Sequence, residues 1–340
     1  MSDLKICVLG SGVIGLTTAI ELRKEFRNSS IDIIADAFYS GTTSFVAAGL
    51  FLPIESNSGG SVERTSAWVK DSYNYWENIR ALSESEEIGI RHLSGHILLN
   101  RSYNEESKAL ESLIPELRPL SEEELKFWPG NWKYGKYCTT LQIDPSRYLK
   151  WALYKVKELN INIIQRKITD FGQLTDGNYD VIANCTGIGA KVLCEDNELF
   201  ALRGQVSLVK APWVKNFVLD GNDCDTYIIP SFDNIVLGGC RHFESYNLAP
   251  NHYDALSMRE KCEHLIPSLK NATLVEHKVG LRPFRLVTRV EQEYKPCSGR
   301  NMKIVHNYGH GGSGITLAPG TSLNAVQLVK DILIERRSKM

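Results

Sequence analysis

The stretch Ile6-Cys7-Val8-Leu9-Gly10-Ser11-Gly12-Val13-Ile14-Gly15 decides how the chain begins to fold. Its apolar first four residues are typical of a parallel strand that is buried on both faces. A helical pattern of apolar residues follows from Leu16 to Phe26, and residues 31–35 read as a second strand. The sequence therefore predicts a strand–helix–strand unit with a right-handed crossover.

The glycine pattern within this stretch predicts a dinucleotide site, because it lies between a strand and a helix. Gly10 makes the tight turn, Gly12 lets a pyrophosphate approach the backbone, and Gly15 lets the helix pack closely on the strand. The start of the helix, at Val13 and Ile14, offers N–H groups and a positive dipole to the phosphates. The alternative is a glycine-rich turn with a purely structural role.

Asp36 extends this prediction from the phosphates to a sugar. It ends the second strand, where a carboxylate is placed to accept hydrogen bonds from an adenosine ribose. Taken alone, the glycines and this carboxylate leave NAD and FAD open as cofactors.

The composition describes a globular protein whose length of 340 residues and hydrophobic fraction of 43% suffice for a proper core. The 39 basic and 40 acidic side chains give a formal net charge of −1, which argues against a globally basic surface for nucleic acid. No apolar run is long enough for a membrane span. The eight cysteines form no Cys-x-x-Cys pair, as expected of reduced thiols. We therefore expect neither nucleic acid nor membrane among the partners.

Both ends of the chain bear on its location. The first residues lack the length and the cleavage site of a secretory signal, which predicts an intracellular protein. The last three residues, Ser338-Lys339-Met340, resemble the Ser-Lys-Leu peroxisomal address with Met in place of Leu. We predict the peroxisomal matrix, with an import receptor as partner, and otherwise the cytoplasm. The alternative for this tripeptide is the frayed end of a basic helix.

The rest of the chain alternates between two patterns. Strand and helix signals typical of a parallel sheet occur at 145–159 (helix), 161–164, 179–184 and 303–306 (strands), and from about 320 to 337 (helix). Between them we expect helices at 68–82, at 105–113 and from Ser121, and antiparallel strands at 205–209, 226–230 and 235–239. The predicted fold class is α/β, with a Rossmann-like domain interleaved with an α+β substrate domain that contains an antiparallel sheet. The boundaries are 1–53, 144–200 and 298–340 for the first domain, and 54–143 and 201–297 for the second.

Further motifs resemble those of the D-amino-acid oxidase and D-aspartate oxidase family. They occur in the family's order from residue 6 to the C-terminus, so the resemblance covers essentially the entire chain. The motifs are Thr42-Thr43-Ser44 with Val46-Ala47-Ala48-Gly49-Leu50, Asn184-Cys185-Thr186-Gly187, Arg203-Gly204-Gln205-Val206, Ala211-Pro212-Trp213, Tyr227-Ile228-Ile229-Pro230, Gly280-Leu281-Arg282-Pro283 and His306-Asn307-Tyr308-Gly309-His310-Gly311-Gly312-Ser313-Gly314-Ile315-Thr316.

This resemblance implies an FAD-dependent oxidase. A D-amino acid would be oxidised to an imino acid, which yields a 2-oxo acid and NH3, while O2 is reduced to H2O2. The first domain would then bind FAD. The residues that the resemblance and the glycine pattern assign to FAD are Gly10, Gly12, Val13, Ile14, Gly15, Asp36, Thr42, Thr43, Ser44, Ala48, Gly49, Leu50, Ile168, Thr186, Gly187, Arg282, Gly311, Gly312, Ser313, Gly314, Ile315 and Thr316.

The resemblance also implies which residues bind the substrate. Arg282 matches the arginine that holds the substrate α-carboxylate, a role that suits a planar guanidinium which is always charged. Tyr227 matches the tyrosine whose hydroxyl joins that clamp. Gly312 matches the position whose carbonyl receives the substrate amine. We nominate no general base, because none is needed if the amine binds in its neutral form.

The preferred D-amino acid depends on a few positions. Arg241 matches an arginine of D-aspartate oxidases and predicts acidic substrates, D-aspartate or D-glutamate. A partly buried pair between this guanidinium and a carboxylate would contribute roughly 1.5–3 kcal/mol. Leu219, Gly312 and Ile54 depart from that branch, so neutral D-amino acids remain the alternative. The nearby Glu55, Asp220, Asp223 and Asp225 are expected to be solvated loop charges.

Three other functions remain open from the residues alone. An NAD-dependent dehydrogenase would use the same glycine pattern. A zinc hydrolase would need His92 and His96, or His306 and His310, but neither pair has the glutamate of a His-Glu-x-x-His site, so no metal ligand is assigned. A nucleotide-binding sensor without enzymatic activity would retain FAD and form no peroxide.

Overall fold

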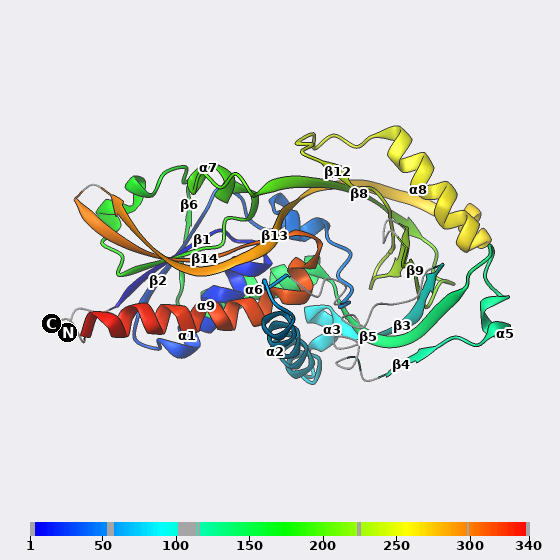
Figure 1. The fold of residues 1–340 in the computed structure, drawn as a ribbon, viewed down its shortest axis with the longest axis horizontal. Helices are drawn as coiled ribbons and strands as arrows, with labels where there is room; N and C mark the ends of the chain where they lie inside the picture. Colours follow the sequence, from blue (N-terminus) through cyan, green and yellow to red (C-terminus); the bar gives the residue numbers. More distant parts are fainter. Residues whose placement is uncertain are drawn as a thin grey trace.

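The computed structural model describes residues 4–52, 58–100, 114, 116–222, 226–297 and 299–337. Its strands join into one continuous sheet (Figure 1) in the order β4-β5-β3-β9-β10-β11-β8-β13-β14-β7-β1-β2-β6, with β12 paired to β8. The strands are β1 (Lys5–Leu9), β2 (Ser30–Ala35), β3 (Ile90–Leu99), β4 (Glu116–Pro119), β5 (Tyr134–Ile143), β6 (Asn162–Gln165), β7 (Val181–Asn184), β8 (Phe200–Lys210), β9 (Phe217–Asp220), β10 (Tyr227–Pro230), β11 (Ile235–Gly238), β12 (His242–Phe243), β13 (Thr273–Cys297) and β14 (Arg300–His310).

The parallel part of the sheet confirms the predicted fold class. Strands β14, β7, β1, β2 and β6 are parallel neighbours, as expected for a Rossmann-like arrangement. Strand β1 lies at their centre and its last four residues are fully buried, which explains why that run has no polar residue.

Helices cover this parallel region, and α1, α9 and α2 lie together beneath it in Figure 1. The helices are α1 (Val13–Glu25), α2 (Val62–Arg80), α3 (Ser85–Ile88), α5 (Glu122–Leu125), α6 (Pro145–Glu158), α7 (Ala190–Leu193), α8 (His252–Leu265) and α9 (Gly314–Arg337). The largest apolar core cluster lies between the sheet and α1, α2, α6 and α9, and it includes the fully buried Trp76 and Tyr148.

Two helix starts were wrong in the sequence analysis. Helix α2 begins at Val62 rather than at 68, because the Ser61 hydroxyl accepts a hydrogen bond from the Arg64 N–H and caps it. Helix α9 begins at Gly314 rather than near 320, because a 3₁₀ turn at residues 311–313 leads directly into it. Pro319 is therefore inside α9, and the neighbouring Gly320 N–H donates to the Ser72 hydroxyl of α2 (2.8 Å). The helix expected at 105–113 lies outside the described residues.

The second part of the sheet is mainly antiparallel, as predicted. Strand β11 pairs antiparallel with both β10 and β8, and β3 pairs antiparallel with β5. Helix α8 packs on β8 and β11 and closes a smaller apolar core with Met258, Cys262 and Leu265.

Strand β13 joins the two parts. Its first half pairs with β8 in the antiparallel region, and its second half pairs with β14 beside the parallel strands. The register shifts between Phe284 and Arg289, where the strand passes from one partner to the other. The predicted division into two interleaved domains remains a prediction, because this one sheet runs through both. In the part of the chain that the structure describes, no helix is long and apolar enough to cross a membrane.

Candidate active site and cofactor cavity

One large cavity, of about 1530 Å³, gathers nearly all residues singled out from the sequence. It extends from the carboxyl ends of the parallel strands to the antiparallel strands. The predicted residues that line it are Gly10, Gly12, Val13, Ile14, Asp36, Thr42, Thr43, Ser44, Ala48, Gly49, Leu50, Ile168, Thr186, Gly187, Tyr227, Arg241, Arg282 and Gly311 to Thr316. Gly15 does not line the cavity.

At the cofactor end, the backbone comes so close that side chains are excluded. Gly10 has φ of +100°, and a Cβ there would overlap the carbonyl oxygen of Cys185. Gly15 lies behind the turn, where a Cβ would overlap the carbonyl oxygen of Gly10, so its role is close packing of α1 on β1. The Ser44 hydroxyl accepts a hydrogen bond from the Val13 N–H (3.0 Å) and attaches the segment around residue 44 to the start of α1.

Asp36 lies in the same cavity beside two basic residues that the sequence analysis missed. Strands β2 and β6 are parallel neighbours, so Asp36 and the pair Arg166 and Lys167 follow carboxyl ends at one edge of the sheet. Such an edge is where ligands of open α/β sheets bind. The signal that could have found them is their position directly after the strand at 162–165.

At the substrate end, two glycines in strands make room for the predicted clamp. A Cβ at Gly204 of β8 would overlap the Arg282 guanidinium, and a Cβ at Gly238 of β11 would overlap the Tyr227 ring. The guanidinium donates from Nη1 to the Cys240 carbonyl (3.4 Å). Among the described residues, no carboxylate forms an ion pair with Arg282. This leaves its charge available to an anion in the cavity.

Tyr227 lies directly against this guanidinium. Burial raises the pKa of Tyr227, and the neighbouring positive charge of Arg282, together with a hydrogen bond from it, acts in the opposite direction. The tyrosine is therefore a neutral hydroxyl near neutral pH, able to donate to a carboxylate that Arg282 binds.

The residues that bear on specificity are divided between a charged rim and an apolar wall. Arg241 lines the cavity and is exposed, because the main chain carries it to the rim after β11 has ended. Leu219 is buried opposite Tyr227 and, with Val206 and Ile229, forms an apolar wall.

Of the four acidic residues that were expected near this site, the structure describes only Asp220. Asp220 accepts hydrogen bonds from the backbone and side chain of Asn222 in a turn and does not line the cavity. Ile54, Glu55, Asp223 and Asp225 lie outside the described residues.

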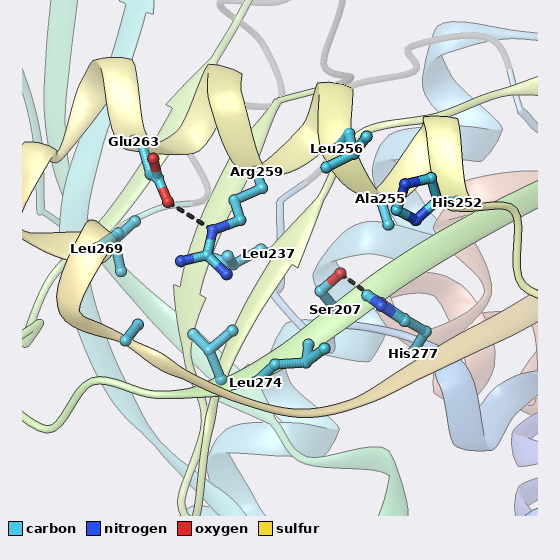
Figure 2. Close-up of a pocket in the computed structure, with 12 residues that line it drawn as sticks. Ser207, Leu237, His252, Ala255, Leu256, Arg259, Glu263, Leu269, Leu274 and His277 are labelled. Carbon is cyan, nitrogen blue, oxygen red and sulfur yellow. Dashed lines mark hydrogen bonds and ion pairs between the residues drawn. The ribbon is translucent and has the colours of Figure 1, made fainter.

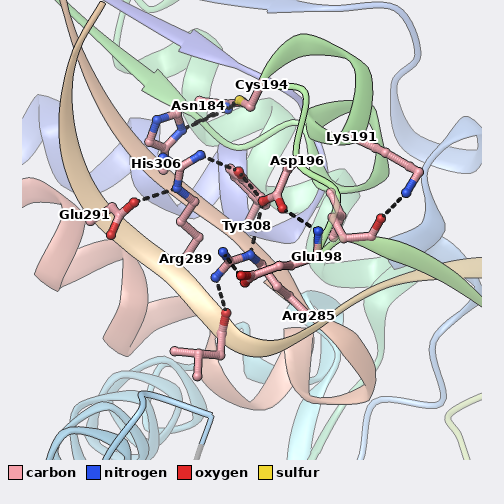
Figure 3. A network of polar contacts seen from close by, with 12 residues as sticks. Asn184, Lys191, Cys194, Asp196, Glu198, Arg285, Arg289, Glu291, His306 and Tyr308 are labelled. Carbon is pink, nitrogen blue, oxygen red and sulfur yellow. Dashed lines mark hydrogen bonds and ion pairs between the residues drawn. The ribbon is translucent and has the colours of Figure 1, made fainter.

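A polar network surrounds Tyr308, which directly precedes the glycine-rich turn at residues 309–314 (Figure 3). The Tyr308 hydroxyl donates to Asp196 (2.8 Å) and accepts from Arg289 Nη1 (2.9 Å), and Asp196 also accepts from Arg285 (3.1 Å). These bonds fix the strand that leads into residues 309–314. His310, the last residue of β14, is buried against the Thr321 hydroxyl, and burial lowers its pKa to about 3, so its ring is neutral.

The two histidine pairs considered for zinc lie on strands β3 and β14 rather than on helices. Residues four apart on a strand are about 13 Å apart, which is too far to share one metal ion. His92 hydrogen-bonds to Glu77 (2.7 Å), and His306 to Glu293 (2.8 Å). His92 and His306 therefore have structural partners.

A second pocket, of about 210 Å³, lies between helix α8 and strands β8, β11 and β13 (Figure 2). It is mainly apolar, and four of its polar side chains form two pairs: Arg259 with Glu263 (2.6 Å), and Ser207 with His277 (2.8 Å). None of the residues predicted to bind cofactor or substrate lines it, so the large cavity is the candidate active site.

Comparison with known proteins shows which family the chain belongs to. The model of the family described as "FAD dependent oxidoreductase" matches residues 5–328. The chain belongs to this family. Its cofactor is FAD, so the alternative of an NAD-dependent dehydrogenase was wrong, and the prediction of an FAD-dependent oxidoreductase is confirmed.

Individual relatives match over nearly the full chain. Human D-aspartate oxidase is 34% identical over 97% of this chain and 96% of its own length. A D-amino acid oxidase from Dugesia ryukyuensis is 32% identical over 98% of this chain and 100% of its own. Among solved structures, glycine oxidase from Geobacillus kaustophilus has the same fold, with a TM-score of 0.77 at 18% identity over 97% of this chain and 95% of its own.

The residues present fit FAD. The cavity is long enough to join the acidic end at Asp36 with the clamp at Arg282, and its glycine turns leave room at the backbone. The buried Oδ1 of Asn307, which lines the cavity, has no hydrogen-bond partner among the described residues. A bound group with a donor would satisfy it.

Proposed function

We propose that this protein is an FAD-dependent oxidase that converts D-amino acids to 2-oxo acids with release of NH3 and H2O2, and that it prefers acidic substrates, D-aspartate and D-glutamate. The observation that carries the proposal is Arg282. Its guanidinium faces the cavity without an ion-pair partner among the described residues and lies in the same cavity as the glycine-rich turn at residues 309–314.

Arg282 and Tyr227 hold the substrate by its α-carboxylate. The guanidinium binds the two oxygens, and the neutral Tyr227 hydroxyl donates a further hydrogen bond to one of them. Gly312 has open space where a side chain would be, so its carbonyl can accept from the substrate amine. With the carboxylate and the amine both fixed, the α-hydrogen can point in only one direction, toward the flavin site. Only the D-enantiomer then also places its side chain in the remaining space.

FAD, when bound, accepts the two electrons and the hydrogen that leave the α-carbon and passes them on to O2. The protein contributes orientation and electrostatics. Gly314 and Ile315, at the start of α9, line the cavity, so the positive end of the helix dipole lies beside it. No general base is needed, because an amine that binds in its neutral form has no proton to lose before oxidation. Water then converts the imino acid to the 2-oxo acid and NH3.

Arg241 supports the preference for acidic side chains. It lies on the cavity rim, where a substrate side chain that points away from Arg282 can reach it. Human D-aspartate oxidase, at 34% identity, supports the same preference. The apolar wall of Leu219, Val206 and Ile229 supports the second candidate, oxidation of neutral D-amino acids.

A substrate panel tests the proposal. The FAD-loaded protein, recognisable by its absorption at ~450 nm, is assayed for peroxide with D-Asp, D-Glu, D-Ala, D-Met and D-Arg. We expect the highest kcat/KM with D-Asp or D-Glu. Equal or faster turnover of D-Ala would reject the acidic preference. No peroxide with any D-amino acid would reject the oxidase and favour a flavin-binding sensor.

We also propose that the protein acts in the peroxisomal matrix, with an import receptor as its partner. The support is the C-terminal Ser338-Lys339-Met340, which lies outside the described residues. A fluorescent protein fused to the N-terminus should give a punctate peroxisomal pattern, and deletion of the three residues should make it diffuse. The same pattern with and without them would reject this location signal.

A further inference from the structure

We propose that Cys240, His242 and Asp254 form a binding site for a borderline divalent cation, with Zn²⁺ as the best match. The thiol sulfur, an imidazole nitrogen and a carboxylate oxygen lie within 4.8 Å of one another. These are donor types that Zn²⁺ takes in proteins. These three residues were not predicted from the sequence, where only the two histidine pairs were considered for zinc, since Asp254 comes from a different element than Cys240 and His242.

The fold brings the three residues to one place. Cys240 follows β11, and His242 begins β12, where it pairs directly with Arg203 of β8. Asp254 is in the first turn of α8, and its N–H donates to the side chain of the helix cap Asn251 (3.1 Å). Arg203 of β8 thus pairs with His242 and also hydrogen-bonds to Asp254, which brings the carboxylate beside the thiol of Cys240 and the imidazole of His242.

Two of the ligands are already oriented by neighbours. The Cys240 sulfur accepts a hydrogen bond from the Gln205 N–H (3.0 Å). The Asp254 Oδ2 accepts from Arg203 Nη1 (2.8 Å), and Arg203 is only 3% exposed. The other oxygen, Oδ1, faces His242 Nε2 (3.0 Å). Such outer partners orient the ligands of established metal sites.

The third ligand can complete the geometry. Ligand atoms around tetrahedral Zn²⁺ are about 3.5 Å apart, so the cluster must contract by about 1 Å. The His242 side chain is 48% exposed and can turn towards the other two, and its exposure leaves the fourth position open to water. Because Arg203 offsets the charge of Asp254, the affinity should be below that of a structural site with four protein ligands.

The cation would lie beside the substrate end of the large cavity. Cys240 lines that cavity, and its carbonyl accepts the hydrogen bond from Arg282. Arg241 is the residue between the two ligands 240 and 242. A bound cation would fix this segment, so we expect Zn²⁺ to raise the KM for D-aspartate reversibly. This consequence, unlike the site itself, rests on the proposed function.

The binding test uses the FAD-loaded protein after removal of metal with a chelator. Equilibrium dialysis against Zn²⁺, followed by metal analysis, should give one ion per chain. Co²⁺ in its place should give the near-ultraviolet charge-transfer band of a thiolate ligand. Cys240→Ser should abolish that band, and both Cys240→Ser and His242→Gln should weaken binding by more than the roughly 10–100-fold that loss of an outer partner costs.

Matched controls are Cys297→Ser, which removes another partly exposed thiol, and His264→Gln, which removes an exposed histidine at the opposite end of α8. Both should bind Zn²⁺ as the unmodified chain does. If no ion is retained, or if all four variants bind equally, the site is refuted.

The activity test is separate from the binding test. Added Zn²⁺ should raise the KM for D-aspartate in the unmodified chain and have no effect in His242→Gln. Stoichiometric Zn²⁺ without a change in KM would refute the coupling to the substrate end. If no D-amino acid yields peroxide, the proposed function fails, and the metal content still decides the site.

Discussion

The two ends of the large cavity are built in different ways. The cofactor end consists mostly of backbone: the turn at residues 10–15, the segment at 42–50 and the turn at 309–314 all come within reach of a ligand through glycines and main-chain groups. The substrate end consists of side chains on β10 and β13, and Gly204 and Gly238 make room for them.

This difference shows which property of the enzyme is easy to change. A backbone cradle tolerates few substitutions, because the positions of main-chain groups depend on the whole sheet. The substrate end depends on single side chains, so exchanging one of them can alter the substrate without altering the fold. Cofactor and substrate preference should therefore respond to separate sets of mutations.

The largest effect should come from the clamp. Arg282→Met removes a charge that binds carboxylate, at about 1.5–3 kcal/mol for each charged hydrogen bond, so kcat/KM should fall by about 10²–10³-fold or more. Arg282 is also among the residues assigned to FAD, but the backbone at the other end of the cavity should hold most of the cofactor, so FAD content, measured from flavin absorption, should fall far less than kcat/KM. Arg259→Met, in the smaller pocket beneath α8, is the matched control and should keep full activity. A comparable loss in both variants would contradict the clamp.

A smaller effect, at the other end of the cavity, should come from Gly10→Ala. The substitution forces an unfavourable φ and an overlap with the Cys185 carbonyl, which together should cost about 2–4 kcal/mol of unfolding free energy and most of the bound FAD. Gly299→Ala separates the two causes, since Gly299 also has positive φ (+77°) but open space around it. It should cost about 1 kcal/mol. Equal losses in urea unfolding would show that overlap is unimportant.

The acid sensitivity of the fold should depend on His310. Its lowered pKa means that, between about 3 and its ordinary 6.5, the unfolded chain binds a proton that the folded chain does not. Stability therefore falls as the pH drops through this window, and His310 should account for about 2 kcal/mol of the loss at about pH 5. The free energy of unfolding in urea is measured at neutral pH and at about pH 5. The decrease between the two should be about 2 kcal/mol smaller in His310→Asn than in the unmodified chain. If the decrease between the two pH values is the same in both proteins, His310 is not the cause of the acid sensitivity.

The smallest effect should be the most selective. Arg241→Gln should lower kcat/KM for D-aspartate by about two- to fivefold, since the guanidinium is exposed and its pair with a substrate carboxylate is partly screened. Turnover of D-alanine, which has no second carboxylate, serves as the internal control and should stay the same. A parallel loss for both substrates would assign Arg241 a structural role instead.

Sequence reasoning reached the cofactor end more completely than the substrate end, for a physical reason. A backbone cradle needs glycines at fixed intervals beside a strand and a helix, and such local spacing is visible in one segment. Arg282 and Tyr227 were assigned only through family motifs, because a strand pairing across dozens of residues leaves no local pattern. The glycines that make room for them, Gly204 and Gly238, look like weak strand residues until their neighbours are known.

The misplaced features have similar causes. The start of α9 was set too late because Pro319 and Gly320 resemble a helix boundary, and the packing against Ser72 that accommodates them is a tertiary contact. The exposure of Arg241 could not be read from the sequence, because it depends on where β11 ends relative to the cavity. Arg166 and Lys167 were missed because the partner that brings them to Asp36 is a strand more than 120 residues away.

Strand β13 also limits how the gene can be divided. Its 25 residues, Thr273–Cys297, contribute hydrogen bonds to both parts of the sheet. A fragment cut at the predicted boundary after residue 297 would leave β14 without its long antiparallel neighbour and expose an unpaired edge. Arg282 on β13 and the turn at residues 309–314, which follows β14, thus depend on the same pair of strands. Exchanging modules between relatives would have to carry both strands together.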